Sequence, residues 1–457
     1  MPLSLDKIII TPADKKTEDK KSGFITRFSF GFRRFAASFA TDYNDYSASG
    51  DNNRTLKIWV NWGRDQAMVL NSLITESFTP ETGINVNLEI TNAGLVKGIL
   101  SNNAPDLSLH MARTEPVNLV MRNALVDLTE FEDYGEVISR FGESATTPYA
   151  YGNGIYALPD TQSFYIMFYR SDILSQLGIA VPETWDEFLT AVSVLERNNM
   201  NAWIPYTQIT TSSTVNIGVG GLNLFSSVLQ QYGGSLYNKE LNGCDWNNDP
   251  VMLKAFTFWT DMYTKYKMPE TLSFYNRFRV GTTPLGIDVY TNYTSLSQAA
   301  PEIDGRWGIA LVPGIKNEDG TVNHTVSGAG TGCGILKSSE NKDAAWEFLK
   351  WWTRADTQLA YNNGVESILG AVSRVTTATL EAFQNMAWDG DDLEILSEQR
   401  SYIKEIPEIP GSYYVSRSVD QAFWNVINKS QRPKDMLEKW GTVANQEIKR
   451  KIAEYAN

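Results

Sequence analysis

Residues 152–188 read GNGIYALPDTQSFYIMFYRSDILSQLGIAVPETWDEF, and this stretch decides the fold. A Gly/Asn turn leads into an apolar strand over 155–158, which we expect to break at Pro159. A second, almost entirely apolar strand is expected over 164–169, followed by a short helix that ends at Gly178. The pattern of strand, strand and helix therefore makes this stretch a structured connection.

A longer helix is expected after Pro182. Thr184 and Glu187 have the spacing of a capping box, in which the Thr hydroxyl and the Glu carboxylate satisfy the first free amide groups of a helix. Apolar side chains then recur at helical spacing, which predicts one buried face made of Trp185, Phe188, Leu189, Val192 and Leu195.

The segment YALP at 156–159, the aromatic strand after it and LSQLGIAVPETWDEF at 174–188 together resemble a known family. They are similar to the extracellular solute-binding proteins of ATP-driven sugar importers, the maltose-binding-protein-like superfamily. The resemblance runs from about Thr55 to the end of the chain. It implies a type II periplasmic-binding-protein fold, in which two α/β lobes joined by a hinge enclose a ligand cleft. The stretch 152–188 would cross between the lobes.

The resemblance also implies lobe boundaries. We expect residues 54–160 and 326–372 in the first lobe, and residues 161–325 and 373–457 in the second. Residues 1–53 lie outside the resemblance, and we expect them to be a strand, a linker and an amphipathic segment that end a preceding extracellular domain of a longer chain. The Phe- and Arg-rich segment 23–43 is open to two interpretations, a helix that lies on a membrane or a linker helix that packs on protein.

Composition narrows the range of partners. The 457 residues carry a net charge of −13 and no basic run that could follow a phosphate backbone, so we expect no nucleic-acid partner. No apolar run reaches the length of about 18 residues that a membrane-spanning helix needs. The N-terminus does not read as a secretory signal, but the resemblance implies an extracellular protein at the cell surface. Cys244 and Cys333 could form one disulfide, although isolated buried thiols fit their number and separation better.

The first globular segment predicts a sheet that is parallel in part. Residues 55–60 read as a strand, 66–78 as a helix with one apolar face, and 84–90 as an alternating strand, which together make a βαβ unit. Ligands bind beyond the carboxyl ends of such strands. The loops at 61–65 and 111–113 follow two strands of this sheet, so we expect them to meet at one edge.

Catalytic patterns are missing from the sequence. It has two histidines and no H-E-x-x-H or G-x-S-x-G motif. The run GAGTGCGILKS resembles a phosphate loop in composition only, and we interpret it as a close-packed hinge segment. We therefore expect no enzyme activity, no catalytic residue, no metal and no cofactor.

A sugar site combines aromatic faces with groups that donate or accept hydrogen bonds. Trp62 is the expected aromatic platform, although a core tryptophan at a strand end would look the same. Arg64 and Asp65 could be partners of the sugar or simply solvated charges at a helix start. The full set of expected ligand-binding residues, in which Thr331 and Glu366 rest on the resemblance, is Trp62, Arg64, Asp65, Arg113, Asp160, Gln162, Asp288, Tyr290, Thr331, Glu366 and Arg417.

The resemblance implies capture of a mono- or oligosaccharide for the permease subunits of an ABC transporter. Two other functions stay open. A sugar-sensing ectodomain of a signalling system would use the same fold and cleft, and a glycan-active enzyme would need an opposed carboxylate pair. A peptide ligand is also compatible with the sequence.

Overall fold

The computed structural model describes residues 55–91, 94–206 and 224–455. All of them belong to one compact unit, Tyr46–Asn457. The expectations for residues 1–53 lie outside the described residues. Within these, no helix is both long and apolar enough to cross a membrane.

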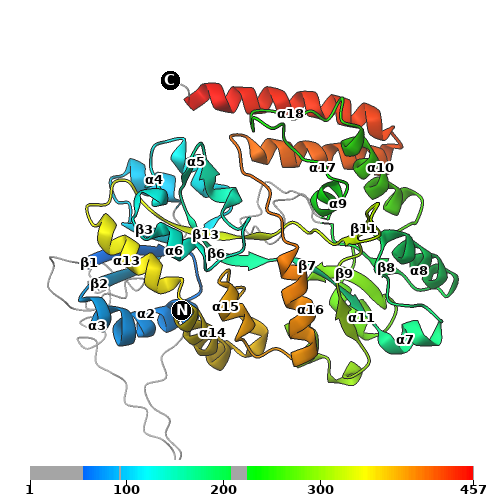
Figure 1. The fold of residues 1–457 in the computed structure, drawn as a ribbon, viewed down its shortest axis with the longest axis horizontal. Coiled ribbons are helices and arrows are strands. Elements are labelled where there is room, and N and C mark those ends of the chain that lie inside the picture. Colours follow the sequence, from blue (N-terminus) through cyan, green and yellow to red (C-terminus); the bar gives the residue numbers. More distant parts are fainter. Residues whose placement is uncertain (1–54, 92–93, 207–223, 456–457) are drawn as a thin grey trace, which may run out of the picture. The chain divides into compact units, whose positions relative to one another are not determined.

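Two β-sheets organise the described chain (Figure 1). The first sheet has the strand order β2-β1-β3-β13-β6. Its strands are β1 (Thr55–Val60), β2 (Asn85–Ile90), β3 (Leu107–Ala112), β6 (Leu158–Ser163) and β13 (Ala329–Ile335). Strand β1 pairs in parallel with β2 and β3, which confirms the predicted βαβ unit, whereas β13 runs antiparallel to β3 and β6.

Both faces of the first sheet are covered. Successive residues of β1 show this, because Ile58 and Trp59 belong to different hydrophobic clusters. The Ile58 cluster takes in α2 (Arg64–Leu73), the π-helix Ile74–Phe78, α13 (Lys342–Trp352) and α14 (Ala355–Leu369). The Trp59 cluster takes in α4 (Leu95–Leu100) and α5 (Glu115–Val120).

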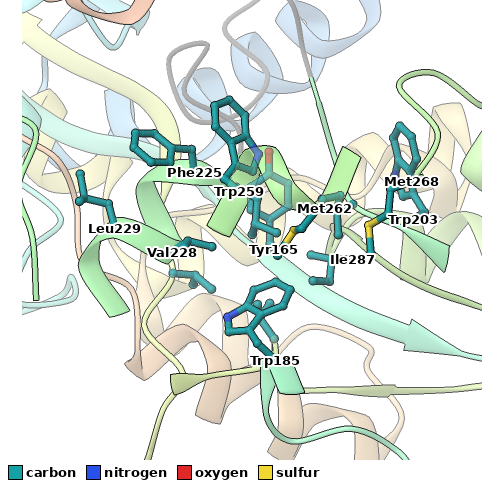
Figure 2. Packing of buried hydrophobic residues seen from close by; sticks show 14 of the residues in the cluster. Tyr165, Trp185, Trp203, Phe225, Val228, Leu229, Trp259, Met262, Met268 and Ile287 are labelled. Atoms are coloured by element: carbon teal, nitrogen blue, oxygen red, sulfur yellow. The ribbon is translucent and has the colours of Figure 1, made fainter. Parts of the chain in front are cut away.

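The second sheet has the order β10-β7-β9-β8. Its strands are β7 (Tyr165–Tyr169), β8 (Ala202–Trp203), β9 (Leu285–Val289) and β10 (Gly308–Ala310). Its core is rich in aromatic side chains, and Figure 2 shows Trp185, Phe225 and Trp259 packed around Tyr165 and Ile287. These three aromatic residues come from α8 (Trp185–Arg197), α9 (Phe225–Gln231) and α10 (Pro250–Thr264).

Helix α8 confirms the capping prediction. Thr184 Oγ1 accepts from the Glu187 amide at 3.3 Å, and Glu187 Oε2 accepts from the Thr184 amide at 3.0 Å. The five residues predicted for its inner face are all buried.

The expected break at Pro159 is wrong, because β6 runs through it. β6 lies at the edge of its sheet, and the ladder is irregular where Pro159 faces β13. An edge strand or a bulge is where a strand tolerates a residue without an amide hydrogen. Only Phe164 separates β6 from β7, so the chain passes here from one sheet to the other, as expected. The residue boundaries of the two lobes stay a prediction.

The remaining helices include a C-terminal pair, α17 (Ser412–Lys429) and α18 (Pro433–Tyr455), which lie side by side (Figure 1). Cys244 and Cys333 are both free and buried, which confirms the interpretation as isolated thiols. The other α-helices and strands are α3 (Thr79–Thr82), α6 (Tyr134–Ile138), β4 (Ala150–Tyr151), β5 (Gly154–Ile155), α7 (Ser171–Gln176), α11 (Phe274–Arg279), α12 (Asn292–Ala299), β11 (Ile315–Lys316), β12 (Val322–Asn323), α15 (Leu380–Gln384) and α16 (Gly390–Ser401).

Candidate functional site

A β-bulge in β3 turns His110 away from the regular ladder. Gly334 of β13 lies opposite Ser108 and Gly332 lies opposite Met111, so β3 has one residue more than its partner. His110 has a φ of 56°, a left-handed conformation that is uncommon for a residue other than glycine. Bulges of this kind bend a strand and re-aim a side chain, and they are frequent beside functional sites.

A second irregularity lies on the other side of β13. Thr331 pairs with Thr161 and Gly332 pairs with Pro159, which leaves Asp160 of β6 as the extra residue. The two neighbours of β13 therefore both carry an extra residue at nearly the same level, and the side chains of His110 and Asp160 meet there.

Hydrogen bonds tie these side chains into one group. Asp160 Oδ2 accepts from the backbone amide of His110 at 3.0 Å, and Oδ1 accepts from Nε1 of Trp352 at 2.8 Å. Thr331 Oγ1 lies 3.0 Å from His110 Nδ1 and 2.8 Å from Thr161 Oγ1. The His110 side chain is 35% exposed, so the group reaches the surface.

Trp62 completes the group from the end of β1. Its ring stacks on Tyr361 at 5.3 Å, and the edge-to-face contact with His110 is 5.9 Å. Trp62, from the first expected loop, thus lies beside His110 of β3, whereas Arg113 of the second expected loop lies in a different group. Trp62 is half-buried, so its exposure is intermediate between that of a core tryptophan and that of an exposed platform. We refer to Trp62, His110, Asp160, Thr161 and Thr331 as the strand-end cluster.

Glycine permits the close approach of the two strands. A Cβ on Gly330 would lie 1.9 Å from the Thr161 carbonyl oxygen, a distance that no other residue could accept. The interpretation of the run around GAGTGCGIL as a close-packing segment is confirmed at this position.

Arg113 and Gln162 belong to a separate buried network. Arg113 is 5% exposed, and it donates from Nη1 to Glu405 at 2.5 Å and from Nε to Glu408 at 3.0 Å. Nη2 donates to the Ile406 carbonyl, and Gln162 Nε2 donates to the other oxygen of Glu405 at 2.9 Å. We refer to Arg113, Gln162, Glu405 and Glu408 as the Arg113 network.

The Arg113 network contains two carboxylates, Glu405 and Glu408, but only one cation, Arg113. Burial alone would lower the pKa of Arg113, but Glu405 and Glu408 outweigh it and the pKa of the guanidinium rises. Burial raises the pKa of Glu408, whose Oε2 has no hydrogen-bond partner among the residues that the structure describes. Two carboxylates therefore share one cation in a site with little access to water.

The six other expected residues lie in neither group. Arg64 and Asp65 are exposed on the first turn of α2, and Arg417 is exposed on α17. Asp288 accepts from Trp203 Nε1 at 3.2 Å, and burial raises its pKa to about 6.

Tyr290 and Glu366 also have protein partners. Tyr290 is 1% exposed and stacks on Phe164 at 4.5 Å. Glu366 accepts from Nε of Arg374 at 2.7 Å. The structure thus brings Trp62, Asp160 and Thr331 together and separates them from the rest of the expected set.

Four residues of these two groups were not expected. His110 is one of two histidines and lies within a largely apolar strand, which is a usable signal, but its left-handed φ cannot be read from the sequence. Thr161 had no distinguishing signal. Glu405 and Glu408, in KEIPEIP, have the character of surface carboxylates until the fold brings Arg113 to them.

Comparisons with known proteins identify the family and the fold of the chain. The model of the bacterial extracellular solute-binding protein family matches residues 66–359. The structure of the sugar-binding protein MalE from Xanthomonas citri has a TM-score of 0.71 at 16% identity, and the match covers 88% of this chain and 100% of that one.

Two further solved structures have the same fold. The cyclic α-maltosyl-1,6-maltose binding protein of Arthrobacter globiformis matches with a TM-score of 0.69 at 17% identity, over 87% of this chain and 99% of that one. An ABC transporter solute-binding protein of Thermotoga lettingae, bound to α-D-tagatose, matches with a TM-score of 0.60 at 19% identity, over 87% and 100%. No curated protein matches the sequence.

Proposed function

The chain belongs to the family of bacterial extracellular solute-binding proteins, and we propose that it captures a carbohydrate and delivers it to the permease subunits of an ABC transporter. Proteins of this family and the solved structures of the same fold bind their ligands and are not enzymes. We place the protein outside the cell, associated with the cell surface. The printed ligands of the similar structures, among them tagatose and a cyclic maltosyl-maltose, support a sugar as cargo.

The strand-end cluster is the observation that carries the proposal. It lies at the carboxyl ends of the parallel strands β1 and β3, where ligands bind in open α/β sheets. Trp62 supplies an aromatic ring that is not fully covered, and an apolar sugar face can stack on such a ring. His110, Thr161 and Thr331 supply polar atoms that can exchange hydrogen bonds with sugar hydroxyls.

Asp160 positions this cluster. Its side chain is 2% exposed and both oxygens already accept hydrogen bonds from the protein. Asp160 therefore holds His110 and Trp352 in place, and the contact with the cargo falls to Trp62, His110, Thr161 and Thr331.

Closure of two lobes around the cargo is the second part of the proposal. The lobes are residues 54–160 with 326–372 and residues 161–325 with 373–457. The Arg113 network supports a defined closed arrangement, because Arg113 of the first lobe pairs with two carboxylates of the second. Closure of this kind gives a transporter a liganded shape to recognise.

Thermal unfolding of the full chain against mono-, di- and oligosaccharides, with peptides as controls, tests the cargo class. A ligand at about a thousand times its Kd stabilises the folded state by about 4 kcal/mol, which raises the unfolding temperature clearly. A shift with one class of sugar supports the proposal and names the cargo. No shift with any sugar, or a shift with peptides alone, contradicts it.

A further inference from the structure

A cavity of about 740 Å³ lies away from the strand-end cluster. The loop 142–147, residue Gln162 of β6, helix α15 and the end of α16 with the residues after it form its wall. Phe383 and Leu380 make part of the wall apolar, and hydroxyl and amide side chains make up much of the rest. Its volume lies within the range of sites for small molecules, roughly 300–1,000 Å³.

The cavity and the strand-end cluster use opposite sides of β6. Thr161 bonds to Thr331, whereas the next residue, Gln162, bonds to Glu405 and lines the cavity. Successive side chains of a strand point to opposite faces of its sheet. A ligand in the cavity would therefore be distinct from the sugar proposed at Trp62.

Arg400, in the wall of this cavity, is a buried cation with unpaired donors. Its side chain is 6% exposed, and Nη2 donates to the carbonyl oxygens of Thr377 at 3.2 Å and Ala378 at 2.5 Å. Within the described chain, Nε and Nη1 have no hydrogen-bond partner. The guanidinium carbon lies 4.5 Å from the ring centre of Phe383. The buried hydroxyl of Tyr290, which acts electrostatically on Arg400, also lacks a hydrogen-bond partner in the described ranges.

A comparison with Arg113 shows that Arg400 lacks a carboxylate partner within the described chain. Both guanidiniums are buried to nearly the same extent, at 5% and 6% exposure. Two carboxylates raise the pKa of Arg113, whereas burial lowers the pKa of Arg400 to about 10 and no carboxylate of the described residues opposes this shift. A buried charge is normally paired, because removal from water is costly. Arg400 has the surroundings of an arginine whose counter-ion comes from a ligand.

We propose that this cavity is a second binding site, which takes a small organic anion whose carboxylate or phosphate group pairs with Arg400. Lys404, also in the wall, adds a second positive charge, and the hydroxyls of Ser401 and Thr147 can donate to further oxygens of the anion. Glu143 lies in the same wall and is exposed, so it opposes anions that extend towards it. The site therefore suits a ligand with one anionic group at Arg400 and a neutral remainder.

Isothermal titration calorimetry of the full chain at constant ionic strength tests this site. The probes are inorganic phosphate, glycerol 3-phosphate and glycerate, which carries a single carboxylate, with glycerol as the neutral counterpart. We expect either the phosphates or glycerate to bind, which identifies the anionic group, and glycerol to give no heat. Arg400→Gln should weaken binding at least tenfold.

Two further variants make the result specific. Gln384→Trp fills the cavity from an exposed position without removing the cation, and should also weaken binding at least tenfold. Arg432→Gln removes a positive charge that is 83% exposed elsewhere, and should bind as the parent does. Equal binding by the parent and Arg400→Gln, or no binding of any anion at millimolar concentration, overturns the proposal. The sugars of the thermal panel are neutral, so failure of either proposal leaves the other standing.

Discussion

Trp352 donates its indole N–H to Oδ1 of Asp160 across 2.8 Å, and the two residues are only 1% and 4% exposed. This bond joins the core of α13 to the extra residue of β6. We expect Trp352→Phe to lower the free energy of unfolding by about 2–3 kcal/mol in urea denaturation, because a buried carboxylate loses a donor that water cannot replace.

Trp346→Phe is the matched control. Trp346 also donates to a carboxylate at 2.6 Å, but its partner Asp133 is 37% exposed and water can take over the bond. We expect its loss to be smaller by at least about 1 kcal/mol. Equal losses in the two variants would show that the Asp160 bond adds nothing beyond ring packing.

The left-handed backbone of His110 predicts an order of stability between two variants. Both His110→Ala and His110→Gly remove the imidazole, but only glycine adopts a φ of 56° without steric cost. We expect the alanine variant to be less stable by about 1 kcal/mol, from the left-handed penalty of roughly 1–2 kcal/mol per residue. Urea unfolding compares the two directly, and a more stable alanine variant would mean that the bulge is not retained.

In the Arg113 network, we expect substitutions of Arg113, Glu405 and Glu408 to have strongly non-additive effects on stability. Arg113→Met should lower the free energy of unfolding by about 3–5 kcal/mol, because it leaves two carboxylates buried without a cation. Adding Glu405→Gln and Glu408→Gln should restore much of this stability, since the uncompensated charges are then gone. A triple variant that is as unstable as the sum of the separate changes would rule out the coupling.

We expect the ring of Trp62 to contribute to the affinity of the proposed sugar site. With a sugar identified by the thermal panel, Trp62→Ala should raise its Kd at least tenfold in calorimetry, because the stacking face is lost. Trp62→Phe keeps a ring and should retain most of the affinity. Circular dichroism shows that each variant is folded under the assay conditions, and an unchanged Kd in the alanine variant would place the sugar elsewhere.

Asp288 predicts a pH dependence of stability. Burial raises its folded-state pKa to about 6 from an ordinary value of 3.8. Its protonated form is favoured by folding, so the contribution is complete below about pH 4 and is lost as the pH rises through 6. The shift of about two units corresponds to roughly 3 kcal/mol at most.

Asp288→Asn removes this titration. Between pH 4 and pH 7.5, the parent should lose more stability in urea unfolding than the variant does. Asp65→Asn, at an exposed position, is the control and should follow the parent. Identical pH profiles for the parent and Asp288→Asn would mean that Asp288 titrates alike in the folded and unfolded chains.

Local periodicity was enough to predict the βαβ start of the first sheet and the capped helix α8, because those signals lie within one element. The bulges at His110 and Asp160 depend on how β13 pairs with strands that are distant in the sequence, so no local pattern predicts them. Arg113 shows the same limit. Its residue type and position predicted a ligand contact. The two carboxylates that pair with Arg113 lie almost 300 residues further along the chain, so no local pattern indicates them.

The strand order of the first sheet has a consequence for synthesis on the ribosome. β6 joins that sheet through β13, which follows it by about 170 residues. At roughly 5–20 residues per second, the nascent chain carries β6 for about 10–30 s before its partner is made. During this time the first sheet lacks β13, and its unpaired strand edges are prone to aggregation and can be bound by a chaperone. The first sheet is completed only after most of the second sheet has left the ribosome.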